Sequence, residues 1–316
     1  MSLTVKQFSN VDGFPKAAEL IEITGAHALE ASDRAIFNQL YQIAHESNRL
    51  VDPDADWETT YASLRRASSK HESNDRLKES LRRLRRTEVK VTYVDESTGK
   101  RRVMETHLLD FTDTEADGQS NDGTVQFGIP KRLRVVLARS NRWGRIRCEV
   151  SYAMTSKYAI ALYEMVCLRA NRDHCVEVFS YEEFRALLNV PPGTYERGQD
   201  FQRKVVDPAL LEVNGLSDIG VDIELRRRHA RAPIHEVAIS WWKKSGDEYR
   251  AALAERNRPK VGRMARLRGQ VENADISSPS PTPHALPAKV AATVEAMRSG
   301  GAAESDIEAF IKGQAA

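Results

Sequence analysis

Hydrophobic and polar positions follow two different periods between residues 155 and 242. Residues 155–168 and 199–214 have helical spacing, and the apolar positions of the second run are Phe201, Val205, Val206, Ala209 and Leu210. A shorter run at residues 179–190 has Ser180 in N-cap position and Glu183 three residues later. Residues 221–225 and 234–239 alternate with period two, which predicts a β-hairpin. These elements together predict a winged helix over residues 149–245.

A similar order of patterns occurs over residues 27–148. Residues 29–44, 57–67 and 73–86 predict three helices, and the third has a buried stripe of Leu77, Leu81 and Leu84. Asp54 stands where an N-cap would serve the second of these helices. Residues 89–94 and 102–109 then alternate as strands around a turn at residues 95–100. We therefore expect a first winged helix whose wing is the hairpin of residues 89–109.

The other segments are expected to connect or extend these two domains. Residues 1–26 are weakly patterned and predict an N-terminal arm, whereas residues 110–123 are polar and predict a surface loop. A strand at 124–127 and a helix at 130–139 follow. Beyond residue 245 the chain predicts a basic helix at 247–268, a Pro/Ser linker at 277–287 and two marginal helices at 289–297 and 303–311.

The predicted fold class is therefore α+β. It consists of two tandem winged-helix domains, each a helical bundle with a β-hairpin wing, and a C-terminal tail at residues 246–316.

Charge is clustered along the chain although the net charge is only +2. Residues 131–147 hold seven basic residues and no acid, and residues 243–268 hold nine basic residues against three acidic ones. Residues 65–102 are also strongly basic. Such clusters are typical of a face that binds a polyanion. For any single run, an ordinary solvated helix face is the alternative.

The predicted helix at 199–214 is the candidate DNA-recognition helix, because its apolar stripe leaves polar residues on the other sides of its N-terminal half. Arg203 is the first choice for a base contact, since a guanidinium binds guanine bidentately and a Gln amide can pair with adenine. For Asp200 the alternatives are a hydrogen bond accepted from cytosine and an interaction with the helix dipole, and we favour the second. The candidates on this helix are Gln199, Gln202, Arg203 and Lys204.

Two further groups of cations are candidates for phosphate contacts. The tip of the second predicted hairpin carries Arg226, Arg227, Arg228 and Arg231, which suit phosphates or a minor groove. A merely soluble loop of this composition is the alternative. The predicted helix at 73–86 contributes Lys78, Arg82, Arg83 and Arg86 around its leucine stripe.

The second domain resembles the C-terminal winged helix of the iteron-binding plasmid replication initiators, the Rep family with two winged helices. The resemblance is carried by residues 155–163, 184–190, Tyr195, 200–209, 212–214 and 221–225. A looser match extends back over residues 29–148. The chain departs from the family pattern at residues 214–218, where the family usually has a further residue or two, and in its long tail.

This resemblance implies a bacterial plasmid replication initiator that binds repeated origin sequences as a monomer and helps to open the adjacent DNA. It also implies that a dimeric form, joined through the first domain, represses its own gene, and that host initiator and helicase-loading proteins are partners. No cofactor is expected. The alternative is a winged-helix transcriptional regulator that binds a promoter palindrome.

Enzymatic and membrane functions are not indicated by the sequence. The eight histidines never occur two apart, as the metal site of a rolling-circle initiator would need, and the Ser-Thr-Gly-Lys at residues 97–100 lacks the upstream Gly of a phosphate-binding loop. No metal site is expected. The three cysteines, Cys148, Cys167 and Cys175, have no zinc-site spacing and predict reduced thiols in a cytoplasmic protein. No apolar run approaches the roughly 20 residues of a membrane-spanning helix.

Overall fold

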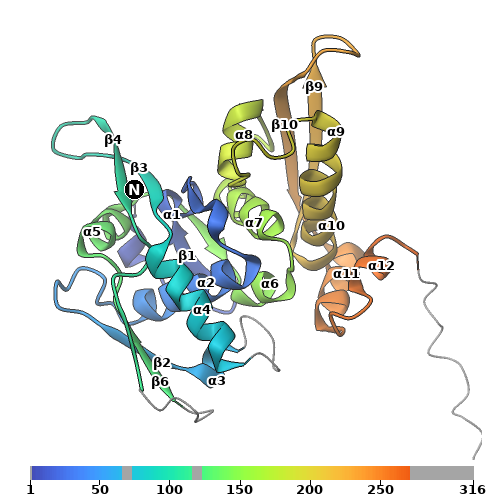
Figure 1. The fold of residues 1–316 in the computed structure, drawn as a ribbon. Coiled ribbons are helices and arrows are strands. Elements are labelled where there is room, and N and C mark those ends of the chain that lie inside the picture. Colours follow the sequence, from blue (N-terminus) through green and yellow to red (C-terminus); the bar gives the residue numbers. More distant parts are fainter. Residues whose placement is uncertain (1, 66–72, 116–122, 271–316) are drawn as a thin grey trace, which may run out of the picture. The chain divides into compact units, whose positions relative to one another are not determined.

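The computed structural model describes residues 2–65, 73–115 and 123–270 (Figure 1). These residues belong to one unit of the chain, and residues 271–316 form a second unit. The predicted Pro/Ser linker and the two marginal helices lie in that second unit, outside the described residues.

Two long helices of the first domain form where the apolar stripes predicted them. They are α2 (Ala31–Glu46) and α4 (Asn74–Arg86), and the α4 stripe of Leu77, Leu81 and Leu84 is buried. The α4 helix begins at Ser73, whose hydroxyl accepts a hydrogen bond from the Arg76 N–H at 3.4 Å. The α2 helix begins with a reciprocal capping box between Glu30 and Asp33.

The helix predicted at residues 57–67 is wrong in its first half. Residues Trp57–Thr60 form strand β2, which pairs antiparallel with β6 (Thr124–Phe127) and buries Trp57 and Thr59 on one face. Among the described residues of this range, helical structure is confined to Tyr61–Leu64, α3, whose N-cap is Thr60 rather than Asp54. The β-branched threonines satisfy their backbone groups across the sheet, which local periodicity cannot reveal.

The wing of the first domain is also not the hairpin that the sequence predicted. Strands β3 (Val89–Val94) and β4 (Arg101–Thr106) form the predicted hairpin, but as a separate two-stranded sheet. Within the described residues, β3 is also joined to Thr24 by an isolated antiparallel bridge at Lys90. The sheet that contains β2 has the order β2-β6-β5, and β5 (Thr112–Thr114) comes from the segment that was expected to be a loop. Strands β5 and β6 therefore hold the place of the wing strands in this sheet, as β9 and β10 do in the sheet of the second domain.

The expected N-terminal arm is part of the folded unit. Strand β1 (Phe14–Ala17) is fully buried and pairs with β7 (Trp143–Ile146), and α1 (Ala18–Ile21) follows it directly. The predicted helix at 130–139 is confirmed as α5 (Lys131–Arg139), and α6 (Cys148–Ala153) leads into the second domain. Phe14, Leu20 and Ile21 are core residues, so this segment is held by hydrophobic burial.

The second domain has the predicted order of helices and hairpin. Ser180 caps its second helix, because its hydroxyl accepts from the Glu183 N–H at 3.2 Å. The three-stranded sheet has the order β8-β10-β9. The elements are α7 (Lys157–Arg169), β8 (Val176–Ser180), α8 (Tyr181–Leu187), α9 (Gly198–Phe201), η3 (Gln202–Val206), α10 (Asp207–Leu216), β9 (Ile219–Arg227) and β10 (Ile234–Lys243).

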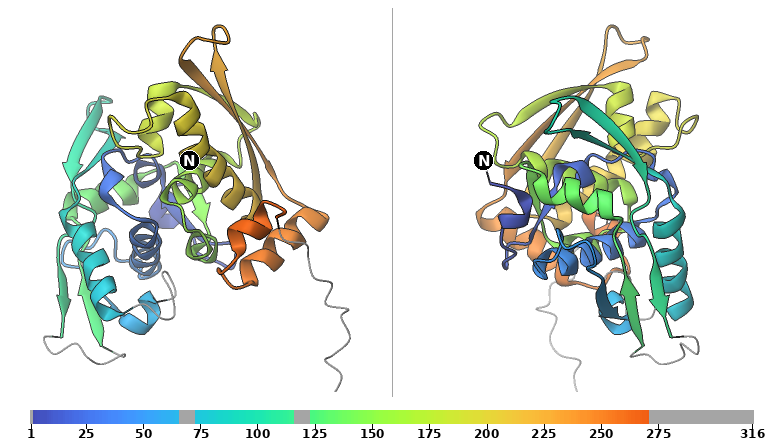
Figure 2. Two further views of the ribbon diagram at one scale, coloured as in Figure 1. Left: turned by 45° about the vertical axis from the view of Figure 1, so that its right-hand side comes forward. Right: turned by 90° about the vertical axis from the view of Figure 1, so that its left-hand side faces the viewer.

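The two hairpins with free tips project to the same side of the described unit. In every view of Figures 1 and 2 the tips of β3–β4 and β9–β10 lie at the upper end, whereas β2 and β6 reach the lower end. A binding surface formed by the tips of both upper hairpins would therefore not include β5 and β6, the wing strands of the first domain.

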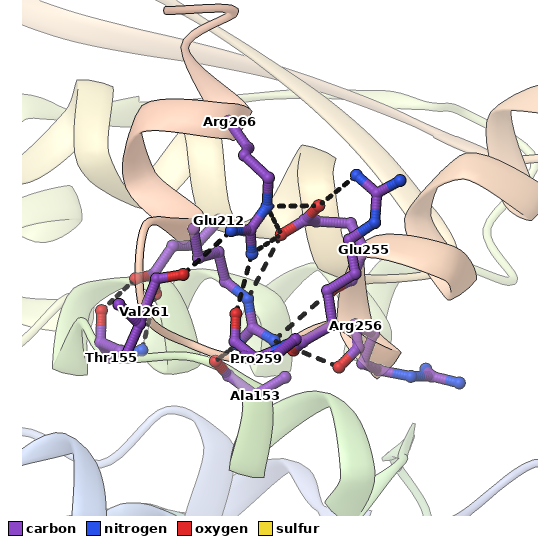
Figure 3. Close-up of polar contacts among 10 residues, drawn as sticks. Ala153, Thr155, Glu212, Glu255, Arg256, Pro259, Val261 and Arg266 are labelled. Atoms are coloured by element: carbon purple, nitrogen blue, oxygen red, sulfur yellow. Dashed lines mark hydrogen bonds and ion pairs between the residues drawn. The ribbon is translucent and has the colours of Figure 1, made fainter. Parts of the chain in front are cut away.

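Residues 246–270 are folded against the second domain instead of forming part of a tail. Helices α11 (Gly246–Asn257) and α12 (Arg263–Leu267) are joined by the buried Arg263, whose guanidinium donates to the carbonyls of Ala153, Glu255, Arg256 and Arg258 (Figure 3). The Ala153 bond, 2.7 Å long, fixes these helices to the C-terminal end of α6.

Candidate nucleic-acid interface

The recognition helix of the second domain is the continuous helical segment of residues 198–216, formed by α9, η3 and α10 (Figure 1). Its buried stripe consists of Phe201, Val205, Val206, Ala209 and Val213. The four predicted candidates on it, Gln199, Gln202, Arg203 and Lys204, are all exposed. The structure therefore brings these four side chains together at one end of the helix, as the sequence predicted.

Two of these side chains are held by neighbours. The Arg203 guanidinium is 70 % exposed and pairs with Asp200 one turn earlier, at 3.2 Å. The Lys204 ammonium lies 5.4 Å from the centre of the Tyr195 ring, within the range of a cation–π contact. Asp200 therefore orients Arg203, a role beyond the dipole interaction that we expected. Exposed pairs of this kind contribute little to stability and leave the cation available for a ligand.

The predicted wing arginines divide into two groups. Arg226 pairs with Glu224 at 2.9 Å, and the Arg227 guanidinium donates to the Ala232 carbonyl at 2.8 Å, so these two help to shape the hairpin. Arg228 and Arg231 are exposed, and within the described part of the chain neither has an acidic partner. The two unpaired arginines at the tip are the better phosphate candidates.

The base of the wing touches the start of the recognition helix. A Cβ atom at Gly198 would lie 2.6 Å from Ile234 Cδ1 and 2.8 Å from Arg227 Nη2. Only a glycine therefore lets helix and hairpin approach so closely without a shift of side chains. Gly198 was not among the predicted site residues, because its role depends on a contact with a hairpin about 30 residues away in the chain.

The predicted cations of α4 also have different environments. Arg83 forms a bidentate interaction with Asp33, at 2.8 and 2.9 Å, and its side chain is only 27 % exposed. Because the Asp33 carboxylate is buried, we assign Arg83 a structural role and correct our expectation that it is available to DNA. Arg82 pairs with Glu79, and Arg86 is exposed.

Lys78 and Arg82 line a hollow beside α4 that the sequence did not reveal. Its volume is about 220 Å³, and its other lining residues are Leu81, Arg85, Thr112 and Thr114. Arg85 donates to the Thr112 hydroxyl at 3.3 Å. Three cations and two hydroxyl groups suit an anion such as a phosphate. The threonines come from β5, which was expected to be loop, so this grouping was missed.

Arg185 is a further residue that sequence reasoning missed. Its guanidinium lies 5.4 Å from the centre of the Tyr181 ring and 5.2 Å from that of Phe201, and it donates to the carbonyls of Thr194 and Tyr195. It thereby fixes the loop that enters the recognition helix. The spacing of four residues between Tyr181 and Arg185 on α8 was the available signal.

No metal centre is found in the described residues, where no group of three or more His, Cys, Asp or Glu side chains could hold an ion. The three cysteines are free thiols. None of the helices in the described ranges has the length and apolar character needed to cross a membrane.

Comparison with known families identifies both domains. Residues 16–167 match the family model described as initiator replication protein, WH1, and residues 180–241 match the model described as initiator Rep protein, WH2. Together the two matches cover about two thirds of the chain. The chain belongs to the initiator Rep protein family.

The fold of this Rep protein is also that of a solved initiator. The crystal structure of the Pi initiator protein in complex with iteron DNA matches 73 % of this chain and 97 % of that chain, with a TM-score of 0.54 and 12 % sequence identity. No curated protein sequence matches the chain. The predicted fold class of two winged helices is thus confirmed, and the chain is a plasmid replication initiator. The boundary at residues 148 and 149 stays a prediction, since the first match extends into α7.

Proposed function

We propose that this initiator binds iteron-type direct repeats at a plasmid origin sequence-specifically, as a monomer. The observation that carries the proposal is the exposed group on the recognition helix, Gln199, Gln202, Arg203 and Lys204, whose helix start contacts the base of a wing with two unpaired arginines at its tip. Such a domain can read base edges in the major groove and hold the neighbouring phosphates.

The first domain contributes phosphate contacts in this proposal. Lys78 and Arg82 line the hollow between α4 and β5 together with Arg85, and Arg86 is exposed at the end of α4. Copies bound to successive repeats would deform the duplex and favour melting of adjacent A·T-rich DNA. Binding energy drives these steps, so the function needs neither catalytic residues nor a cofactor.

The remaining parts of the proposal follow the family resemblance. In the cytoplasm, a dimer joined through the first domain represses the initiator's own gene, and host initiator and helicase-loading proteins assemble at the opened origin. Within the described residues, the β4 edge of the β3–β4 hairpin pairs with no strand other than β3, which supports its use as a surface for another chain.

A fluorescence-anisotropy titration tests origin recognition. The full chain is titrated against tandem-repeat duplexes from the replicon that encodes it and against shuffled duplexes of equal length, at two salt concentrations. Preference for the repeat by about 10³-fold or more is expected, with one chain bound per repeat. Equal affinity for both duplexes would reject sequence-specific binding. Preference for a promoter palindrome bound by two chains would instead favour a transcriptional regulator.

A further inference from the structure

The recognition helix contains one turn that is not α-helical. Segment η3 (Gln202–Val206) is a π-helical turn, in which the Asp207 N–H donates to the carbonyl of Gln202, five residues earlier. The backbone is right-handed helical at both ends of the turn, with φ of −57° at Gln202 and −60° at Asp207. The helix therefore accommodates one extra residue without ending.

Pro208 gives this turn a physical cause. Its ring nitrogen carries no hydrogen, so it cannot donate to the Lys204 carbonyl, and in a regular α-helix its ring would clash with that carbonyl. A proline also disfavours helical backbone at the preceding residue, yet Asp207 is helical. A turn whose hydrogen bonds span five residues relieves the first of these restrictions, because it does not require a hydrogen bond from residue 208 to the Lys204 carbonyl.

The extra residue changes which side chain enters the core. In an uninterrupted α-helix Gln202 would lie three and four residues before the buried Val205 and Val206, at the centre of the buried face. Phe201 takes that place instead, fully buried and edge-on to the rings of Tyr181 and Phe184, at 5.2 and 6.3 Å.

The displaced Gln202 is exposed, next to Arg203 and Lys204. One residue corresponds to about 100° of rotation about the helix axis. The π turn therefore decides whether Gln202 faces the core or solvent.

We propose that Pro208 is a positioning residue for sequence recognition, which acts through the π turn to place Gln202 on the DNA-facing side of the helix. The inference rests on the proposed function, since it assumes that this helix contacts base edges. In this proposal Pro208 does not contact DNA, yet it is one of the residues that determine sequence specificity.

The test compares base preferences at every position of one repeat. Pro208→Ala restores the N–H group and allows the regular α-helix, so the preference due to Gln202 should fall by about tenfold or more at one base pair. Affinity for shuffled duplexes should stay the same, because the phosphate contacts are unchanged. Pro53→Ala, at an exposed proline in the first domain, is the matched control and should keep the wild-type profile.

Gln202→Ala shows whether Pro208 acts through Gln202. It should lose preference at the same base pair, and Pro208→Ala with Gln202→Ala should lose no more than either change alone. An unchanged profile for folded Pro208→Ala, or for Gln202→Ala, would overturn the inference while leaving wild-type recognition intact. If the wild type itself does not prefer the repeat, the proposed function fails as well.

A deletion variant covers the case in which Pro208→Ala does not fold. Removing Gln202 in the Pro208→Ala background takes away the extra residue, so Phe201 returns to the core in an α-helical register. This variant should fold, as judged by circular dichroism, and should keep the preference due to Arg203. If it also fails to fold, the inference is wrong.

Discussion

Lys16 and Glu164 form a buried ion pair between strand β1 and helix α7, with 2.8 Å between the ammonium nitrogen and Oε1. Asn38 lies between them and contacts both, because its Oδ1 accepts from Lys16 and its Nδ2 donates to Glu164. Burial lowers the pKa of Lys16, although the nearby Glu164 carboxylate favours the charged form. The N-terminal segment is thus joined to the second domain by charge as well as by apolar packing.

Glu164→Gln should therefore destabilise the protein strongly. It leaves the Lys16 ammonium buried without a counter-charge, which typically costs about 3–5 kcal/mol. Urea unfolding at neutral pH measures the loss. Lys16→Met combined with Glu164→Leu removes both charges and should recover most of the stability; a double variant as unstable as Glu164→Gln would contradict this explanation.

His45 should make stability depend on pH. Burial lowers the pKa of its imidazole, whose Nε2 lies 3.0 Å from the Thr4 carbonyl, below the usual value near 6.5. Below about pH 6.5 the unfolded chain binds a proton that the folded chain does not, so the free energy of unfolding should decrease as pH falls towards the lowered pKa. His45→Gln should flatten this dependence, whereas His229→Gln, at an exposed position, should not.

Arg83 and Arg86 should respond differently to substitution although both lie on α4. Arg83→Ala leaves the buried Asp33 carboxylate without its bidentate partner and should cost about 2–3 kcal/mol of stability, measured by thermal unfolding. Arg86→Ala should leave stability within about 0.5 kcal/mol and weaken binding to every duplex. Equal melting temperatures for the two variants would argue against a structural role of Arg83.

Arg203 and Arg228 should separate sequence preference from general affinity. Arg203→Ala should lose about 1–3 kcal/mol of discrimination at one base pair. Arg228→Ala should weaken binding to all sequences and reduce the salt slope by about 1. Arg250→Ala is the matched control, because Arg250 is similarly exposed and pairs with Asp247 one turn earlier, as Arg203 does with Asp200. A loss of preference in the control would point to a non-specific cause.

Arg263 should be needed to hold α11 and α12 in place. Arg263→Met keeps the apolar stem but removes the donors to four carbonyls, each of which would be left without its charged partner (Figure 3). Amide hydrogen exchange should become faster in residues 246–267, while α4 keeps its protection. Unchanged exchange in α11 would show that other contacts, such as Leu267 against Gly215, suffice.

The sequence predicted most of the second domain, because its elements carry local signals. Ser180 in N-cap position and the stripe from Phe201 to Leu210 need no knowledge of distant residues. The π turn was missed because the spacings of four and eight residues from Phe201 to Val205 and Ala209 are close enough to the α-helical period to be assigned to one stripe. The turn changes the hydrogen-bond partner of the Asp207 N–H group and the direction of the Gln202 side chain. Neither change can be read from the spacing of apolar residues.

The first domain was harder to predict because its strands pair over long distances. The local sequence around Trp57 and Thr59 is compatible with a helix. Their pairing with Phe127 and Val125 shows that they belong to a strand. For the same reason, the sequence placed the wing in the hairpin nearest to α4. Candidate cations were found by their residue type, but their environments were not predicted. Arg83 differs from Arg86 mainly through its bidentate contact with Asp33, 50 residues earlier in the chain.

Glu212 links the recognition helix mechanically to the segment that leaves the first domain. Its carboxylate accepts from the Thr155 and Ser156 N–H groups, both at 3.0 Å, and from the Thr155 hydroxyl, and it is 1 % exposed. The helix cannot tilt without pulling on residues 155–156, which lie two and three residues after Ala153, the residue whose carbonyl Arg263 binds. A force that a strained duplex exerts on the recognition helix would therefore be transmitted to residues 155–156, in the connection between the domains. A flexible connection would not transmit it.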